Sequence, residues 1–312
     1  PPLPNTTLFR SSPGFLDRQK TIEKASALIE QAAAKGAKLV IFPEAFIPGY
    51  PAWIWRLKPG GDWGLSETLY ASLLENSVNI DRGDLVPLCQ AASANDLTIV
   101  CGLNEKGRQP GNSTLYNTVV IISNAGEIIN CHRKLMPTNP ERMVWGFGDA
   151  SGLKVVESPA GRIGTLLCWE NYMPLARYAL YSQGIEIYIA PTYDSGDGWI
   201  GTLQHIAREA RCWVIGSGVA LENSDIPVDF PEKDRLYPVT EEWINPGDSC
   251  VIAPGGEIVC EPNNQQNRIL YEEIHIDRVY EKRRHLYNTV HYQRQYNYTH
   301  ELQLRPQHPL KI

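Results

Sequence analysis

The sequence contains no uninterrupted apolar run of about 18 residues, the length that a membrane-spanning helix needs, so we expect no membrane partner. It has no basic surplus either: the formal net charge is -6, which leaves no excess of Lys and Arg to neutralise the phosphates of nucleic acid. The first residues show no positively charged start followed by an apolar core, as a secretory signal would. These absences favour a cytoplasmic protein whose main partner is not a nucleic acid.

Paired cysteines are also absent. The seven cysteines are scattered singly, and no Cys-x-x-Cys pair occurs. An odd number of isolated cysteines does not suggest a disulfide framework, and zinc knuckles and dithiol redox centres use cysteines in close pairs. We therefore expect reduced thiols in a reducing compartment, and neither a metal site nor a cofactor.

What the chain does contain is an alternation of short apolar runs and amphipathic segments, typical of an α/β protein. Capping residues and periodicity predict helices over residues 18–35, 66–76, 85–95, 199–210 and 277–285. The apolar runs predict strands over residues 7–10, 38–42, 97–101, 116–123, 127–131, 153–157, 163–167, 186–190, 213–216, 250–253, 257–260 and 269–276. Residues 222–247 show no periodicity and indicate a long insertion loop.

No internal repeat or linker divides the chain. We therefore expect one domain over residues 1–280. The remaining residues, 281–312, are interpreted as the end of a helix and an extended tail that docks at a subunit interface.

The stretch 163–178 joins a buried strand to a helix, with Cys168 between them. The helix is expected from about Pro174, since proline suits the first turn of a helix. A cysteine in this position lies near unpaired backbone N–H groups and the positive end of a helix dipole, and both favour the nucleophilic thiolate. The alternative is a buried structural cysteine that behaves as a small hydrophobic side chain.

Two other polar residues, Glu44 and Lys134, also directly follow predicted strands. If the strands that precede them lie beside the strand that precedes Cys168, the three side chains converge. A carboxylate can act as general base toward the thiol and then toward water. An ammonium group, aided by the N–H of Trp169, can stabilise charge that develops on a substrate nitrogen or oxygen. Taken alone, Glu44 could equally be a solvated turn residue.

A Cys–His hydrolase is the alternative mechanism, and it would need His132, His205 or His291 as the base. His205 falls inside a predicted helix beside an isoleucine, where we expect a histidine of the core or of an interface. Glu170, two residues after Cys168, could be a rival acid, or it could hold the loop by hydrogen bonds.

Three segments together resemble the signatures of the nitrilase superfamily of carbon–nitrogen hydrolases. They are Phe-Pro-Glu-Ala-Phe around Glu44, His-Arg-Lys-Leu-Met-Pro-Thr around Lys134, and Cys-Trp-Glu-Asn from Cys168. The similarity extends over residues 15–292. It implies a Glu–Lys–Cys triad of Glu44, Lys134 and Cys168, and a second glutamate, Glu141, that positions substrate and lysine.

The resemblance also implies a fold and an assembly: a four-layer αββα sandwich that forms a homodimer and in some members a spiral filament. The 222–247 insertion resembles a segment that true nitrilases use in those spirals. The tryptophan after the cysteine and the segment Pro-Thr-Tyr-Asp-Ser around Tyr193 are similar to plant-type and related bacterial nitrilases. The substrate-binding residues expected on this basis are Tyr50, Trp169, Glu170, Thr192 and Tyr193.

The activity implied is hydrolysis of an organic nitrile to acid and ammonia through a thioimidate and a thioester on Cys168, with Glu44 as base and Lys134 stabilising the developing charge. A branch toward the amide can leave from the tetrahedral stage. Two alternatives remain open: an amidase on the same scaffold, and an inactive scaffold that binds a partner protein.

Overall fold

The structure is a computed structural model that describes residues 6–9, 12–109, 111, 113–266, 269–284 and 286. Two six-stranded sheets form its centre. The strands of the first sheet are β1 (Thr6–Phe9), β2 (Leu39–Ile41), β3 (Thr98–Lys106), β4 (Leu115–Ile122), β5 (Ile128–Arg133) and β14 (Ile269–Glu272). Those of the second sheet are β6 (Val156–Ser158), β7 (Gly161–Thr165), β8 (Ile187–Thr192), β9 (Trp213–Gly218), β12 (Gly247–Ile252) and β13 (Ile258–Asn264).

The two sheets have the same internal pattern. The first has the order β14-β1-β2-β3-β4-β5 and the second the order β6-β7-β8-β9-β12-β13. In each, an antiparallel edge pair is followed by two parallel pairings and then two antiparallel ones. The two sheets therefore repeat one topology, although the sequence shows no visible repeat.

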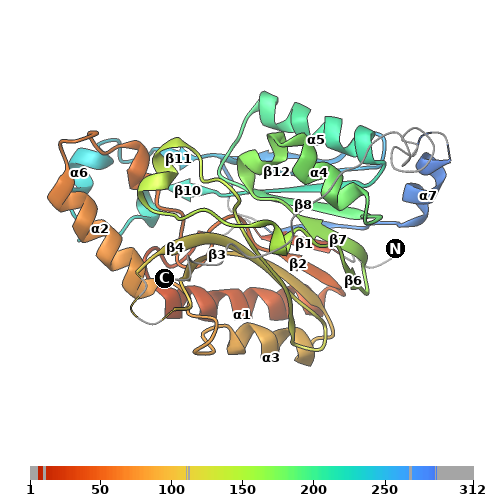
Figure 1. The fold of residues 1–312 in the computed structure, drawn as a ribbon, viewed down its shortest axis with the longest axis horizontal. Coiled ribbons are helices and arrows are strands. Elements are labelled where there is room, and N and C mark those ends of the chain that lie inside the picture. Colours follow the sequence, from red (N-terminus) through yellow and green to blue (C-terminus); the bar gives the residue numbers. More distant parts are fainter. Residues whose placement is uncertain are drawn as a thin grey trace, which may run out of the picture.

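Helices cover the outer face of each sheet, so the expected four-layer αββα sandwich is confirmed (Figure 1). Helices α1 (Arg18–Ala34) and α3 (Val86–Ala94) pack on the first sheet, and α4 (Pro174–Tyr181) and α5 (Asp197–Ala210) on the second. Side chains alternate along the strands: in β2, Val40 faces α1 and α3, whereas Leu39 and Ile41 face the second sheet. Apolar clusters therefore fill all three spaces between the layers.

Most helices begin and end within a few residues of the bounds predicted from the sequence. Asp17 caps α1 by accepting a hydrogen bond from the backbone N–H of Lys20 at 2.9 Å, as its type suggested. Helix α2 (Trp63–Asn76) begins three residues earlier than expected, and β3 extends five residues beyond its predicted end. Helix α7 (Asp277–Arg283) was also anticipated. The predicted tail over 281–312 and His291 lie almost wholly outside the described residues.

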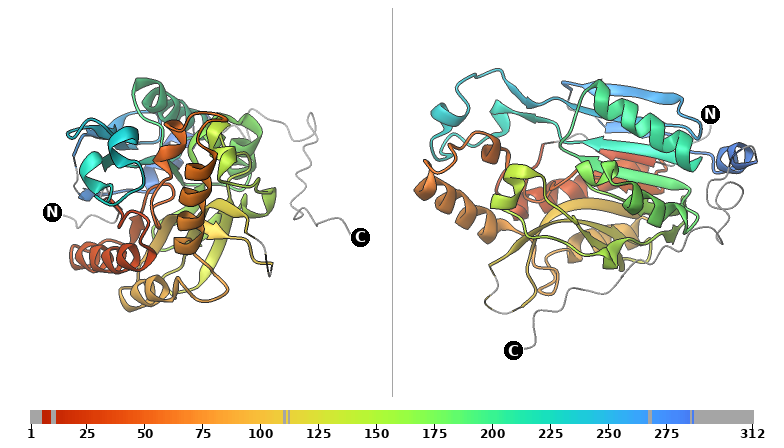
Figure 2. Two further views of the ribbon diagram at one scale, coloured as in Figure 1. Left: turned by 90° about the vertical axis from the view of Figure 1, so that its left-hand side faces the viewer. Right: turned by 45° about the horizontal axis from the view of Figure 1, so that its top comes forward.

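The predicted insertion loop over residues 222–247 is structured, which corrects the sequence-based interpretation. The 222–247 insertion contains β11 (Trp243–Asn245), paired with β10 (Leu221–Glu222), and the short helix α6 (Lys233–Leu236). The insertion is ordered because its apolar side chains join a buried cluster with Trp53, which belongs to the 3₁₀ helix Ala52–Trp55. It lies beside α2 although the two are far apart in sequence (Figures 1 and 2). The loop over 137–147 includes a 3₁₀ turn, Asn139–Met143.

Within the described residues, no helix is long and apolar enough to cross a membrane. The same part of the chain holds no group of three or more His, Cys, Asp and Glu side chains arranged to bind a metal ion. All seven cysteines are free thiols.

Candidate active site

The loop that carries Glu44 leaves β2 and passes directly over β3 at Gly102. A Cβ atom at Gly102 would lie 2.2 Å from the Pro43 carbonyl oxygen and 2.8 Å from the Glu44 Cα, so a side chain there would clash with the loop. The Ile47 N–H donates to the Gly102 carbonyl at 3.3 Å and pins the far end of the loop. Glu44 is fully buried in consequence.

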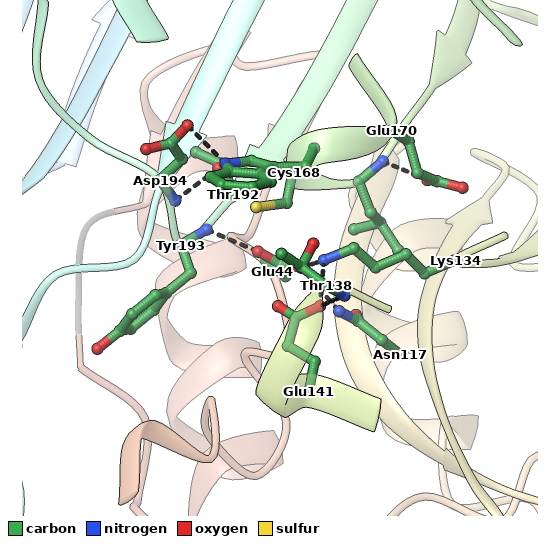
Figure 3. Close-up of polar contacts among 12 residues, drawn as sticks. Glu44, Asn117, Lys134, Thr138, Glu141, Cys168, Glu170, Thr192, Tyr193 and Asp194 are labelled. Atoms are coloured by element: carbon green, nitrogen blue, oxygen red, sulfur yellow. Dashed lines mark hydrogen bonds and ion pairs between the residues drawn. The ribbon is translucent and has the colours of Figure 1, made fainter. Parts of the chain in front are cut away.

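Lys134 follows β5 and joins two carboxylates. Its backbone N–H donates to the Asn117 carbonyl of β4 at 2.7 Å, which fixes the strand end. Its ammonium group donates to Oε1 of Glu44 at 2.9 Å and to Oε2 of Glu141 at 2.8 Å (Figure 3). All three side chains are at most 1% exposed. Two carboxylates against one ammonium leave this buried group with a net negative charge.

The Glu44 carboxylate accepts hydrogen bonds from three elements. Besides Lys134, the Asn117 side-chain amide donates to Oε1 at 2.7 Å and the Tyr193 backbone N–H donates to Oε2 at 2.6 Å. Tyr193 follows β8 in the second sheet, so Glu44 bridges the two sheets. The orientation of the carboxylate is thus fixed from both sides of the sandwich.

Glu141 is held as firmly. Its partners are Thr138, which caps the 3₁₀ turn that contains Glu141, and Tyr50, which precedes the 3₁₀ helix Ala52–Trp55. The Thr138 N–H donates to its Oε2 at 2.6 Å, and the Tyr50 hydroxyl donates to its Oε1 at 2.7 Å. The Trp55 indole N–H donates in turn to the Tyr50 oxygen at 3.2 Å. The Tyr50 ring also stacks on Tyr193, which ties this network to the residue that serves Glu44.

Cys168 begins the 3₁₀ turn Cys168–Tyr172, which separates it from α4. Its φ of 48° lies in the left-handed region that only a few non-glycine residues adopt. The Asn171 amide holds this conformation by donating to the Cys168 carbonyl at 2.6 Å. Figure 3 shows the thiol directed toward Glu44 and Lys134. Such a backbone outlier at a reactive side chain is where strain serves function.

The expected convergence of Glu44, Lys134 and Cys168 is therefore observed, but not by the expected route. The three preceding strands do not lie side by side: β3 and β4 separate β2 from β5, and β7 belongs to the other sheet. The side chains meet because the two sheets pack face to face. Sequence order gives strand ends but not the sheet to which each strand belongs.

The electrostatics of the site correct one expectation. Burial raises the pKa of the Cys168 thiol to about 12, the negative charge of Glu44 adds to the rise, and Lys134 offsets it only in part. The resting form is thus the thiol, because burial outweighs the attraction of Lys134. Burial also raises the pKa of Glu44, against the attraction of Lys134. Burial lowers the pKa of Lys134, but the charges of Cys168, Glu44 and Glu141 raise it well above its ordinary value.

A cavity of about 230 Å³ opens above the thiol. Its walls include Glu141, Cys168, Trp169, Tyr50 and Tyr193, as the sequence-based interpretation anticipated. They also include three residues that this interpretation missed: Trp55, Thr138 and Asp194. Thr138 and Asp194 lie in two of the segments that carry the family resemblance, but the local sequence does not show that they or Trp55 reach the cavity, because that depends on tertiary packing.

Asp194 fixes the most exposed wall of the cavity. Its Oδ2 accepts hydrogen bonds from the Trp169 indole at 2.9 Å and from the Tyr172 hydroxyl at 3.3 Å. Trp169 is 49% exposed, so these contacts and an edge-on contact with the Tyr172 ring hold an indole that solvent would otherwise leave free.

Two of the expected substrate-binding residues do not line the cavity. The Thr192 hydroxyl forms a hydrogen bond with Cys168 and accepts the Asp194 backbone N–H at 2.8 Å. Glu170 is fully buried, and its oxygens accept hydrogen bonds from the backbone N–H groups of Leu135 and Leu167. Its interpretation as a residue that holds the loop fits the structure, and its assignment as a substrate contact does not.

The histidines do not form a Cys–His pair in the described part of the chain. His132 Nε2 lies 3.0 Å from Glu170 Oε2, and the ring is fully buried away from the cavity. The side chain of His205 is 64% exposed on α5, with its ring 3.7 Å from Glu209, so the expectation of a core histidine was wrong. The interface alternative for His205 stays a prediction. Helix position alone did not reveal that this face points to solvent.

Comparison with known proteins identifies the family and agrees with the fold. Residues 8–284 match the family described as carbon-nitrogen hydrolase. A protein of Bradyrhizobium diazoefficiens named nitrilase is 40% identical over 263 residues, which cover 82% of this chain and 78% of that protein. A Nicotiana tabacum protein named bifunctional nitrilase/nitrile hydratase is 36% identical over 269 residues, covering 84% and 75%.

The fold has a counterpart among solved structures. A carbon-nitrogen hydrolase of Helicobacter pylori is similar in structure with a TM-score of 0.70 at 21% identity, covering 93% of this chain and 94% of that one. That likeness concerns the fold, whereas the family match and the relatives above rest on sequence over most of the chain. This protein is a member of the carbon–nitrogen hydrolase family.

Proposed function

We propose that this protein is a thiol-dependent nitrilase that hydrolyses an organic nitrile to the carboxylic acid and ammonia. The observation that carries the proposal is the buried Lys134 between Glu44 and Glu141, next to a cysteine that opens into a small cavity. The names of the Bradyrhizobium and tobacco relatives support the same substrate class.

The thiol of Cys168 needs a base, because its pKa of about 12 leaves it protonated at neutral pH. Glu44 suits this role, since burial raises its pKa and a carboxylate with a raised pKa is a stronger base than one in water. The sulfur attacks the nitrile carbon while its proton passes to Glu44. The ammonium group of Lys134 stabilises the negative charge that develops on the nitrile nitrogen.

The reaction then proceeds through two covalent intermediates. Glu44 then gives this proton to the nitrogen, which forms a neutral thioimidate in which the carbon bears =NH and sulfur and leaves Glu44 ionised again. Water adds with Glu44 as base and gives a tetrahedral species bearing OH and NH₂. Loss of ammonia leaves a thioester, and a second water releases the acid and restores the thiol. Two waters are consumed for each nitrile, and one acid and one ammonia are formed.

Glu141 acts on Lys134 and on the geometry of the cavity. It holds the ammonium group from the side opposite Glu44 and is itself fixed by Thr138 and Tyr50. If the tetrahedral species expels the thiolate rather than ammonia, the product is the amide. The ratio of acid to amide therefore depends on whether the nitrogen or the sulfur is protonated as it leaves.

We also propose the assembly and location of the active protein. It acts as a homodimer or larger homo-oligomer in the cytoplasm, with residues 1–280 as one domain and 281–312 at a subunit interface. The family resemblance supports this assembly, as do the exposed apolar side chains Tyr172 and Leu175 at the start of the α4 region. Sedimentation that shows a fully active monomer at assay concentration would refute it.

The test of the proposed reaction is the release of ammonia and acid from a panel of aliphatic, aromatic and arylacetic nitriles, with the matching amides in parallel. We expect turnover of at least one nitrile, and none by Cys168→Ala, because the thioimidate needs the sulfur. Mass spectrometry of the wild type during turnover should show the adduct on the peptide that contains Cys168. Ammonia from amides but from no nitrile would identify an amidase instead.

A further inference from the structure

The two groups that act on the nitrile come from different sheets. Lys134 follows β5 of the first sheet and Cys168 follows β7 of the second. Within the described residues no strand of one sheet is paired with a strand of the other, and the cluster between the sheets is apolar. Apolar packing is non-directional, whereas reacting groups must be held to within about 0.5 Å. Their separation therefore needs a directional contact.

Glu44 joins the two sheets through Lys134 and the Tyr193 N–H, and a second buried carboxylate, Glu170, joins the two strand ends themselves. Oε1 of Glu170 accepts the backbone N–H of Leu135 at 2.7 Å, and Oε2 accepts the backbone N–H of Leu167, also at 2.7 Å. Leu135 directly follows Lys134, and Leu167 directly precedes Cys168. The two oxygens of a carboxylate are a fixed distance apart, so a single rigid group joins the two strand ends.

His132 orients this carboxylate. Its Nε2 lies 3.1 Å from Oε1 and 3.0 Å from Oε2, and the proton must sit on Nε2 because an ionised carboxylate only accepts. Nδ1 is buried and has no hydrogen-bond partner among the described residues, so Glu170 is the ring's polar contact there. Glu170 also stays ionised: burial raises its pKa, but His132 and the two backbone N–H groups lower it below its ordinary value.

We propose that Glu170, oriented by His132, is a positioning residue that sets the separation between Cys168 and Lys134. The inference rests on the proposed function, in which Cys168 bonds to the nitrile carbon and Lys134 faces the nitrogen. Glu170 does not line the cavity, so it acts through these two residues and not on the substrate.

Glu170→Gln tests this with little change of shape. The amide keeps one oxygen, so one of the two N–H groups retains its acceptor and the other faces an NH₂ group. We expect kcat to fall by on the order of 10²-fold, the effect of displacing a reacting group by about 1 Å, with KM unchanged because the cavity walls are intact. Glu186→Gln is the matched control, since Glu186 is a buried carboxylate that accepts the backbone N–H of Arg162 at 2.9 Å and precedes β8, at the end of the strands opposite the site.

A second measurement does not depend on nitrile turnover. The rate at which iodoacetamide alkylates Cys168 reports how well its proton is removed, and Cys168→Ala gives the background from the other cysteines. We expect slower alkylation in folded Glu170→Gln and in His132→Ala, and recovery of most of the rate in His132→Gln, whose amide can still donate to Glu170. Folding is checked by circular dichroism and thermal melting.

The outcomes separate this inference from the proposed function. A wild type that hydrolyses no nitrile would remove the proposed function, and alkylation would still test the positioning role. A folded Glu170→Gln variant with wild-type alkylation and kcat would overturn that role. So would equal losses in Glu170→Gln and Glu186→Gln that follow their melting temperatures, because the effect would then be general destabilisation.

Discussion

The phenol ring of Tyr50 stacks face to face on that of Tyr193, with 3.8 Å between the ring centroids and 7° between their planes. The two residues serve different carboxylates: the Tyr50 hydroxyl donates to Glu141, and the Tyr193 backbone N–H donates to Glu44. The stack therefore fixes, relative to each other, the two carboxylates that flank Lys134.

Tyr50→Phe tests the hydrogen bond to Glu141 without removing the ring stack. The ring remains, but Glu141 loses a donor worth about 1.5–3 kcal/mol when the acceptor is charged, so we expect kcat to fall on the order of 10-fold. Steady-state kinetics measure the loss, and Tyr50→Ala, which removes the stack as well, should lose more. Equal activity of the Phe variant and the wild type would show that the hydroxyl has no part in holding Glu141.

Glu44→Gln should retain the fold but lose the base, because the amide keeps the shape of the side chain and cannot accept the thiol proton. We expect a loss of at least ~10²-fold in kcat/KM. His205→Ala is the control, since that side chain is exposed, and it should stay near wild type. A folded but inactive histidine variant beside a fully active Glu44→Gln would favour a Cys–His pair.

Gly102→Ala and Gly201→Ala should change stability in opposite directions. A Cβ at Gly102 would clash with the Pro43 carbonyl, so unfolding should become easier by about 1–3 kcal/mol, and activity should fall because Glu44 moves. Gly201 lies within α5, where a Cβ would have no atom within 4 Å, and alanine there should stabilise by roughly 0.5–1 kcal/mol. Urea titrations compare the two. A stable, active Gly102→Ala variant would contradict the close approach.

Activity should be lost at a higher pH than stability when the solution is acidified. Burial raises the pKa of Glu44 above its ordinary 4.5, so the base is protonated, and turnover falls, while the pH is still above that value. Glu105 and Glu170 behave in the opposite way. Burial raises the pKa of each, but the charges of Arg133 and His132, with the accompanying hydrogen bonds, lower it below 4.5.

A lowered folded-state pKa contributes stability that is present above the unfolded value and is lost as the pH falls through the folded one. The protein should thus remain folded at a pH near 4.5, where its turnover of nitrile has already fallen. Parallel kcat/KM and unfolding profiles between about pH 3 and 7 measure this, in steps of about one unit. Activity and stability that decline together would contradict the opposite shifts of Glu44 and Glu170.

The sequence located the candidate residues along the chain better than it predicted how the two sheets bring them together. Glu44, Lys134 and Cys168 were found because each directly follows an apolar run, and local patterns reveal strand ends well. The assignment of those runs to two different sheets was not found, since it depends on contacts between residues far apart in the chain. Glu141 came from the family resemblance alone.

The walls of the cavity were predicted only in part. Trp55 and Asp194 were missed because loop paths depend on packing such as the insertion against α2, which no periodicity encodes. The state of Cys168 was also missed. A helix start suggests a thiolate, but the extent of burial, which decides the matter, is a property of the folded molecule.

The cavity walls carry two carboxylates, Glu141 and Asp194, and include no Lys or Arg among the described residues. Under the proposed reaction an uncharged nitrile enters and a carboxylate anion is formed. Hydrolysis would thus turn an uncharged ligand into an anion with the same sign of charge as these walls. Like-charge repulsion would then favour release of the product. The acid product should therefore compete poorly with nitrile for binding to the cavity. An uncharged amide formed on the side branch would not be repelled, and it should dissociate more slowly than the acid.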